Sequence, residues 1–455
     1  MNRHGLKWKR VLSCFGRFWL FVLFPVACLA QPPNPPARIL FENVRIFDGK
    51  ADRLSGPSYV LVEGNRIARI STSPIQLPTG AAVTRIAGRG NTLMPGLIDV
   101  HVHLTFGAMT MAQLMNPKLT SRGADSIAGL QTRNMLLRGF TSVRDVGGPV
   151  FGLKAGVDSG KYVGPRIWPS GATISQTSGH GDLRMPHERS RRFFGRWSRA
   201  EEMEATFIVD GRDEVLTAVR ENLRRGASQI KLMAGGGTSS VYDPVDVTQY
   251  TLDEMRAAVE AAEDWGTYVT VHAYTPRAVR RAIEAGVKCI EHGQLLDEET
   301  LKLMADKGIW LSGQNLVAST PDMDPMRVQK RKPVIEGQAR LWPLAKKLGV
   351  KLAWGTDFLF EPWLSEEQNA YILKLKPWFT PAEILKMVTY DNAQLLALSG
   401  LRSPYEGRLG VVEEGALADL LLINGDPLTR LELITNPEKN VLVIMKDGKL
   451  YKKAD

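Results

Sequence analysis

The chain has 455 residues, of which 44% are hydrophobic and 23% are charged, and it carries a formal net charge of +10. This composition is that of a globular protein, and it excludes a disordered or a fibrous chain. Half of the excess positive charge lies in the first thirty residues. The remaining charge is concentrated on no single element and accompanies no base-reading motif, so the sequence argues against a nucleic-acid partner.

The first thirty residues have the pattern of a secretory signal. A basic start precedes an apolar run from Phe18 to Ala30, and small residues lie around the end of that run. The run has 13 residues, fewer than the ~20 that a membrane-spanning helix needs. We therefore expect a signal peptide over residues 1–30 and a periplasmic or secreted protein with no stable membrane span. Lipid attachment at Cys28 is the alternative, which Pro25 disfavours.

The two ends of the mature chain are similar in pattern. A Pro-rich segment over residues 31–37 predicts an extended linker. Short β-type runs separated by turn residues follow over residues 38–93, and runs of the same style return over residues 401–455. We expect the two ends to build one small β-sandwich domain.

Between residues 94 and 400, short apolar strands alternate with amphipathic helices, which is typical of parallel βα units. Eight strands are predicted, beginning at Gly96, Thr141, Arg166, Ser228, Tyr268, Lys288, Ile309 and Lys351. Eight units in about 300 residues predict an α/β fold, a (β/α)8 TIM-like barrel. An open doubly wound sheet is the alternative, but no Gly-rich phosphate-binding turn follows the first strand.

Two connections can be interpreted in more detail. A helix is predicted from the N-cap Thr251 to a stop at Gly266. The connection between the third and fourth strands is much longer than a barrel requires and is rich in Gly, Ser and Arg. Connections of this length are usually functional or disordered, and we expect this one to form a lid or a pocket wall.

Four of the seven histidines lie at the ends of predicted barrel strands. His101 and His103 are two residues apart and leave the same face of one strand. His272 and His292 end two other strands, and Asp357 closes a further one. Catalytic groups of such barrels gather at the carboxyl ends of the strands. Each residue alone could be structural, but together they predict a site for zinc or a similar divalent ion.

Lys231 lies within the fourth predicted strand, and the alternation of its neighbours does not decide which face it uses. An inward lysine would bury a charge unless it were paired, neutralised or chemically modified. An outward lysine could extend its amine into solvent. Both alternatives remain open at this point. For Arg144 and Asp145, at the end of the second strand, we expect an ion pair with each other.

Seven motifs occur in the order MPGLIDVHVHL, TSVRDVGG, TSGHGD, IKLMAGGG, VHAY, IEHG and GTD. In these motifs the chain resembles the amidohydrolase superfamily, and within it the imidazolonepropionase-like branch that contains Xaa-Pro-type dipeptidases and ochratoxin-hydrolysing amidases. The resemblance extends from Arg38 to the C-terminus. It implies a small-molecule substrate and a homo-oligomer.

The resemblance also implies two divalent metal ions, with zinc as the expected metal. One ion would be held by His101, His103 and Asp357, and the second by His272 and His292. Lys231 would be carboxylated by carbon dioxide and would bridge both ions.

The implied reaction is cleavage of an amide bond in a dipeptide or an N-acyl amino acid by a metal-bound hydroxide. Asp357 would take the proton of the water and pass it to the leaving amine. His180 in TSGHGD and Tyr274 in VHAY are further catalytic candidates, because either could donate a hydrogen bond to the oxyanion or to a substrate carboxylate.

Two other functions are compatible with the same sequence. The metal site could hydrolyse a cyclic amide or a lactone, and a panel of dipeptides and cyclic compounds would separate these activities. The chain could also be a catalytically inactive barrel scaffold. Inactive relatives of metal-dependent barrels typically lose metal ligands, whereas all six candidate metal ligands are present in this sequence.

Overall fold

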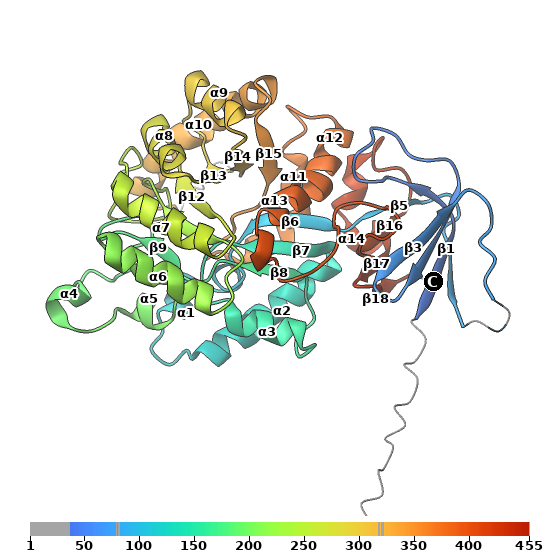
Figure 1. Cartoon of the computed structure of the whole chain (residues 1–455), viewed down its shortest axis with the longest axis horizontal. Coiled ribbons are helices and arrows are strands. Elements are labelled where there is room, and N and C mark those ends of the chain that lie inside the picture. Colours follow the sequence, from blue (N-terminus) through green and yellow to red (C-terminus); the bar gives the residue numbers. More distant parts are fainter. Residues whose placement is uncertain (1–36, 79, 81, 317–318, 320–322, 455) are drawn as a thin grey trace, which may run out of the picture. The chain divides into compact units, whose positions relative to one another are not determined.

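The computed structural model describes residues 37–78, 80, 82–316, 319 and 323–454. The predicted signal peptide and residues 31–36 of the predicted linker lie outside the described residues. The chain from Ala37 onwards forms one compact unit (Figure 1). Among the helices that the structure describes, none is long and apolar enough to cross a membrane.

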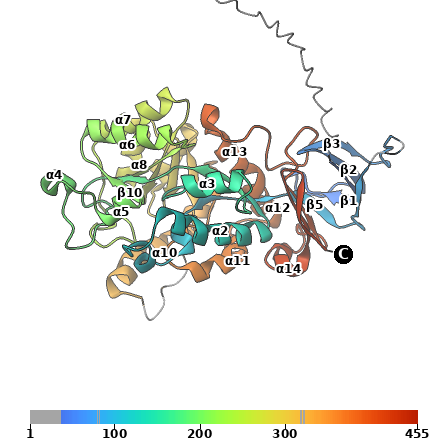
Figure 2. The same ribbon diagram turned by 90° about the horizontal axis from the view of Figure 1, so that it is seen from below.

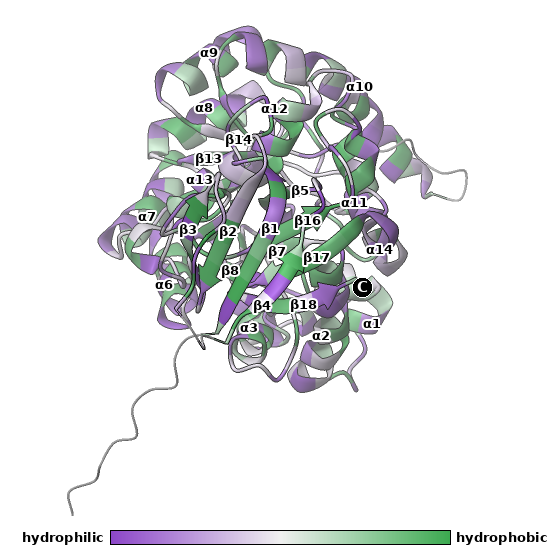
Figure 3. Cartoon of the chain, turned by 90° about the vertical axis from the view of Figure 1, so that its right-hand side faces the viewer, coloured by the Kyte–Doolittle hydropathy of each residue, from purple (hydrophilic) through white to green (hydrophobic). Residues whose placement is uncertain are grey.

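Strands from both ends of the chain form one mixed sheet. Its order is β18-β17-β16-β5-β1-β2-β3, and β4 pairs with β1. The strands are β1 (Arg38–Ile46), β2 (Ser58–Glu63), β3 (Arg66–Ser71), β4 (Thr84–Ala87), β5 (Thr92–Pro95), β16 (Leu420–Ile423), β17 (Val441–Lys446) and β18 (Lys449–Lys453). Phe41 and Val60 from the first half share one buried core with Leu422 and Val443 from the second. Figure 3 faces this domain and shows β16 and β17 as largely hydrophobic, as expected for strands that are buried on both faces.

The barrel is built from two parallel sheets, ordered β6-β7-β8 and β10-β9-β11-β12-β13-β14-β15. Their strands are β6 (Leu97–Val102), β7 (Phe140–Asp145), β8 (Arg166–Pro169), β9 (Thr173–Ser175), β10 (Thr206–Ile208), β11 (Ile230–Met233), β12 (Val269–Ala273), β13 (Cys289–His292), β14 (Trp310–Gly313) and β15 (Lys351–Trp354). The eight predicted strands correspond to β6, β7, β8 and β11 to β15.

Hydrogen bonds link the two parallel sheets at both seams. The backbone N–H of Ser228 donates to the carbonyl of Pro169 at 2.7 Å, and that of Asp357 donates to the carbonyl of His101 at 2.8 Å. Asn392 reinforces the second seam, because its side-chain amide donates to the carbonyls of both Ile98 and Trp354. The arrangement is that of a TIM-like barrel with an added β-domain.

Helices cover the outer side of the parallel strands (Figures 1 and 2). The α-helices that the structure describes are α1 (Met111–Leu114), α2 (Ser121–Leu137), α3 (Phe151–Asp158), α4 (Arg191–Phe194), α5 (Arg199–Glu202), α6 (Arg212–Arg224), α7 (Leu252–Asp264), α8 (Pro276–Ala285), α9 (Glu298–Asp306), α10 (Pro325–Lys347), α11 (Gln368–Leu373), α12 (Pro381–Lys386), α13 (Asn392–Ala397) and α14 (Pro437–Asn440). The last of these, α14, packs against β17 of the β-domain instead. The predicted limits of α7 are confirmed: Thr251 is its N-cap, with a capping box to Glu254, and Gly266 follows in the left-handed region at φ 69°.

The long connection between β8 and β11 includes several regular elements. It contains β9, α4, α5, β10 and α6. Its segment from His180 to Leu183 contributes His180, Gly181 and Leu183 to the lining of the large cavity at the barrel mouth. The prediction of a pocket wall is therefore confirmed for this segment.

Candidate active site

A cavity of about 470 Å³ opens at the carboxyl ends of the parallel strands. It is lined by all eight residues that the sequence singled out, namely His101, His103, His180, Lys231, His272, Tyr274, His292 and Asp357. The histidines of β6, β12 and β13, and Asp357 after β15, lie at or just beyond the carboxyl ends of their strands, and these ends meet at one mouth. Lys231 lies within β11, and His180 lies in the connection after β9.

His101, His103 and Asp357 form a compact group of metal-type donors. Asp357 Oδ1 lies 3.2 Å from His101 Nε2 and 3.3 Å from His103 Nε2. One donor atom from each of the three residues fits within a span of 4.8 Å. His101 Nε2 is buried and makes no hydrogen bond of good geometry with any described residue. A buried ring nitrogen without such a hydrogen bond is suited to bind a metal ion, so the donor set fits a divalent ion.

In three of the histidines, one ring nitrogen is hydrogen-bonded to a carboxylate or a backbone carbonyl. His101 Nδ1 donates to Glu291 Oε2 at 2.7 Å, His103 Nδ1 to the carbonyl of Gly147 at 2.9 Å, and His272 Nε2 to the carbonyl of Gly236 at 3.0 Å. These bonds fix each ring and its tautomer, and they leave the other nitrogen as a lone-pair donor. The three rings are thus oriented as metal ligands are.

His292 and Asp357 hold unusual backbone conformations. Both lie in the left-handed region, at φ 81° and φ 58°, which residues other than glycine rarely adopt. Next to Asp357, a Cβ on Gly355 would lie 2.5 Å from the backbone nitrogen of His101. The close approach of this glycine brings β15 against β6 and holds Asp357 beside the two histidines of β6.

Lys231 points into the cavity, which decides between the two alternatives that the sequence left open. The residue is 1% exposed and lies on the cavity lining. Burial lowers the pKa of its amine, while Glu291 and Asp357 partly oppose this effect. The lysine is therefore the buried group that requires pairing, neutralisation or modification.

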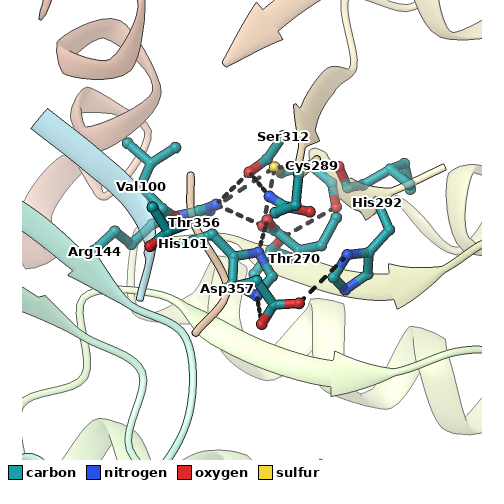
Figure 4. Close-up of polar contacts among 12 residues, drawn as sticks. Val100, His101, Arg144, Thr270, Cys289, His292, Ser312, Thr356 and Asp357 are labelled. Atoms are coloured by element: carbon teal, nitrogen blue, oxygen red, sulfur yellow. Dashed lines mark hydrogen bonds and ion pairs between the residues drawn. The ribbon is translucent and has the colours of Figure 1, made fainter. Parts of the chain in front are cut away.

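A buried ion pair adjoins this group of ligands, and Figure 4 shows its arginine, Arg144, close to His101. Arg144 Nη2 contacts Glu291 Oε1 at 2.6 Å, and the same guanidinium donates to the carbonyl of Val100 and to the hydroxyl of Tyr268. Burial alone would raise the pKa of the Glu291 carboxyl, but Arg144 and then His101 hold it well below its usual range. Glu291 is thus an ionised acceptor for His101.

The predicted ion pair between Arg144 and Asp145 is wrong. Successive residues of a strand point to opposite faces, so Arg144 enters the barrel interior while Asp145 points away from it. Asp145 instead accepts backbone N–H groups from Leu104 and Gly147. Sequence reasoning also missed Glu291, although a charged residue inside the apolar strand CIEH is a signal that it has a buried partner.

His180 and Tyr274 lie against His272 on one side of the cavity. The ring centroids of His180 and His272 are 4.0 Å apart, and those of Tyr274 and His272 are 4.9 Å apart. Burial lowers the pKa of His180 to about 4, so its imidazole is neutral at pH 7. Burial raises the pKa of the Tyr274 hydroxyl, which therefore remains a hydrogen-bond donor.

His180 is held in place by its own neighbours. Its Nδ1 lies 2.8 Å from the hydroxyl of Ser240 and 3.8 Å from Asp243 Oδ2. Lys330 ties the same segment to α10, because its amine donates to the carbonyl of Ser240 at 2.7 Å. The ring therefore keeps a defined orientation toward the cavity.

Comparison with known proteins identifies the family. Residues 92–451 match the model of the amidohydrolase family. The ochratoxinase of Aspergillus niger is 31% identical over 81% of this chain and 77% of its own length. A solved structure of a prolidase in complex with N-methylphosphonate-L-proline is 33% identical, with a TM-score of 0.82 over 92% of this chain and all of that one. A Xaa-Pro dipeptidase with bound methionine in its active site is 29% identical, with a TM-score of 0.76 over 91% of this chain and all of that one. The chain therefore belongs to the amidohydrolase family, and it is a hydrolase that acts on carbon–nitrogen bonds.

Proposed function

We propose that this protein is a binuclear metal-dependent hydrolase that cleaves the amide bond of a dipeptide or an N-acyl amino acid. The observation that carries the proposal is the convergence of four histidines, Asp357 and Lys231 on one cavity. The similarity to a prolidase and to a Xaa-Pro dipeptidase, both over more than nine-tenths of this chain, supports a substrate with an amino acid on one side of the scissile bond.

His101, His103 and Asp357 would hold one ion, and His272 and His292 the other, with zinc as the expected metal. Ions in these positions would supply an acidified water and a Lewis acid for the scissile carbonyl. Asp357 would take a proton from the attacking water and pass it to the leaving nitrogen. His180 and Tyr274 would donate hydrogen bonds to the developing oxyanion or to a carboxylate of the substrate.

Lys231 is proposed to be the bridging ligand after carboxylation. Its amine would add to carbon dioxide with loss of one proton, which gives a carbamate. This change replaces a buried cation with an anion beside two expected cations, so it removes the cost of burying an ammonium group. The lowered pKa of the buried amine is compatible with this reaction, because only the neutral amine adds to carbon dioxide.

Replacing Lys231 with Ala is expected to abolish activity and to lower the metal content. Propionate at millimolar concentration is expected to restore part of the activity, because its carboxylate can enter the vacated volume and bridge the ions. Steady-state kinetics with and without propionate tests this, and the wild type with propionate is the control. A variant that keeps full activity without added acid would contradict the bridging role.

Metal analysis tests the proposal as a whole. The purified protein, loaded with zinc and desalted, is expected to contain about two ions per chain by plasma mass spectrometry. Chelation should abolish cleavage of a dipeptide panel, and re-addition of zinc should restore it. A protein that cleaves dipeptides equally well after complete removal of metal would refute the proposal.

Two further expectations rest on the sequence alone. We propose that the protein is exported to the periplasm or the medium, with lipid attachment at Cys28 as the alternative, and that it forms a homo-oligomer. Mass spectrometry of the mature N-terminus and the molar mass in solution test these expectations.

A further inference from the structure

A segment of the long connection between β8 and β11 projects from the barrel. Figure 1 shows it at the left-hand edge, around α4, and Figure 2 shows the same projection from below. We name residues 189–197 the α4 tip. All of these residues are described, and none of them lines the cavity at the barrel mouth. The α4 tip therefore lies outside the site proposed above.

Three aromatic residues of the α4 tip are exposed to solvent. Phe193 is 83% exposed, Phe194 is 60% exposed and Trp197 is 47% exposed. The helix cannot bury them, because α4 has only four residues, none of which is buried, and it ends at Gly195 in the left-handed region at φ 72°. Single exposed apolar residues are normal on a protein surface, whereas several aromatic residues close together mark an interaction site.

The α4 tip is also basic. It contains four arginines and no acidic residue. Arg191 and Arg192 lie 3.7 Å and 3.0 Å from the carboxylate of Glu214 on α6. Arg189 and Arg196 are exposed, and neither has an ion pair with any described residue. The exposed aromatic rings are therefore accompanied by positive charge that the protein does not neutralise.

A membrane surface with anionic lipids matches both properties of the α4 tip. Its headgroups attract arginines, and its interfacial layer accepts aromatic rings. A second copy of this chain is the alternative partner. Two α4 tips that faced each other would bring positive charges together, and the chain as a whole is basic, with a net charge of +10. Charge complementarity thus favours the membrane over a second copy.

We propose that the α4 tip docks this protein on the surface of a membrane that contains anionic lipids. Phe193, Phe194 and Trp197 enter the interfacial layer, while Arg189 and Arg196 contact the lipid phosphates. The attachment is peripheral and reversible, because it buries a few side chains and inserts no helix. The α4 tip is a different surface from the active site, so this inference does not depend on the proposed function.

Sedimentation with sucrose-loaded vesicles tests the docking of the zinc-loaded chain that begins at Gln31. Vesicles of phosphatidylcholine alone are compared with vesicles in which phosphatidylglycerol replaces part of it. The wild type is expected to bind the anionic vesicles at least about tenfold more tightly, because each arginine near an anionic surface contributes a factor of about five. A salt concentration of about 1 M should remove most of this preference, because it screens the charges.

Two double variants test the aromatic and the basic part of the α4 tip separately. Phe193→Ser combined with Phe194→Ser is expected to weaken binding to anionic vesicles by at least about tenfold, because two apolar side chains no longer enter the interface. Arg189→Gln combined with Arg196→Gln is expected to weaken it by about 10- to 25-fold and to leave binding to neutral vesicles unchanged. All four positions are exposed, so the melting temperatures should change little.

Matched controls remove the same kinds of side chain elsewhere. Leu401 is 77% exposed and lies beside Gly266, to whose carbonyl its backbone N–H donates. Arg53 and Arg69 are exposed arginines between β1 and β2 and on β3. Leu401→Ser, and Arg53→Gln combined with Arg69→Gln, should each bind anionic vesicles within about twofold of the wild type, since charges act only over about a Debye length.

Several results would overturn the docking proposal. They are a wild type that binds neither kind of vesicle or both equally, double variants that bind as the wild type does, and control variants that lose as much binding as the double variants. Light scattering without lipid tests the alternative partner. If the molar mass of the wild type falls in the Phe193→Ser and Phe194→Ser double variant, the α4 tip is an interface between copies and the membrane proposal is wrong.

Discussion

Asp357→Asn is expected to lower kcat by at least about 10³-fold. We expect the melting temperature of this variant to change little from that of the wild type. The carboxylate lies within 3.3 Å of the ring nitrogens of both His101 and His103. The amide that replaces it cannot accept the proton of the attacking water, and it is a poor ligand for a divalent ion. The measurement is kcat at saturating zinc, together with the metal content of the same sample, so that loss of proton transfer is separated from loss of metal.

Glu361→Gln is the matched control for Asp357→Asn. Glu361 also lines the cavity, but its contact is with Arg327 at the rim. We expect kcat of this variant to stay within about threefold of the wild type, because Glu361 transfers no proton in the proposed mechanism. An Asp357→Asn variant as active as the Glu361→Gln variant, with its metal retained, would remove Asp357 from the mechanism.

Glu291→Gln is expected to act on stability and on metal binding together. Glu291 is fully buried between Arg144 and His101, with contacts of 2.6 Å and 2.7 Å. Its neutralisation leaves the buried Arg144 without its carboxylate partner, which costs about 3–5 kcal/mol of unfolding free energy. The hydrogen bond that orients His101 also weakens, so zinc affinity should fall by about 10- to 100-fold.

The two effects of Glu291→Gln can be separated with a double variant. In Arg144→Met combined with Glu291→Gln, no uncompensated charge remains, so the loss of stability should be smaller than the sum of the two single losses. Zinc affinity should stay low, because His101 still lacks its anionic acceptor. Denaturant unfolding and competition with a chelator measure the two quantities. Strictly additive losses of stability would show that Arg144 and Glu291 are not coupled.

Much of the barrel could be predicted from local pattern. Runs such as YVTVHAY and KLAWGTD are short, apolar and bounded by turn residues, so their strand character follows from their own sequence. The direction of parallel strands then places His272, His292 and Asp357 at one mouth without knowledge of the packing. The limits of α7 could also be predicted from the sequence, because the cap at Thr251 and the stop at Gly266 are local signals.

Other features depended on which distant segments meet. The pattern around Lys231 was the same for an inward and an outward side chain, and only the tertiary arrangement of the strands decided that it faces the cavity. The partner of Arg144 lies 147 residues away, at Glu291, whereas sequence proximity had suggested Asp145. Arg331 has no motif around it, and it lines the cavity because the first turns of α10 lie at the barrel mouth.

By itself, then, the amino-acid order determined the α/β alternation, the strand ends that carry metal-type donors and the family resemblance, because hydrophobic periodicity and capping act between near neighbours. The tertiary structure alone decided the burial of Lys231, the pairing of Arg144 with Glu291 and the wall that presents Arg331. Buried charged residues that are far apart in the sequence are paired by the packing of the chain, and the local sequence around each residue does not indicate its partner.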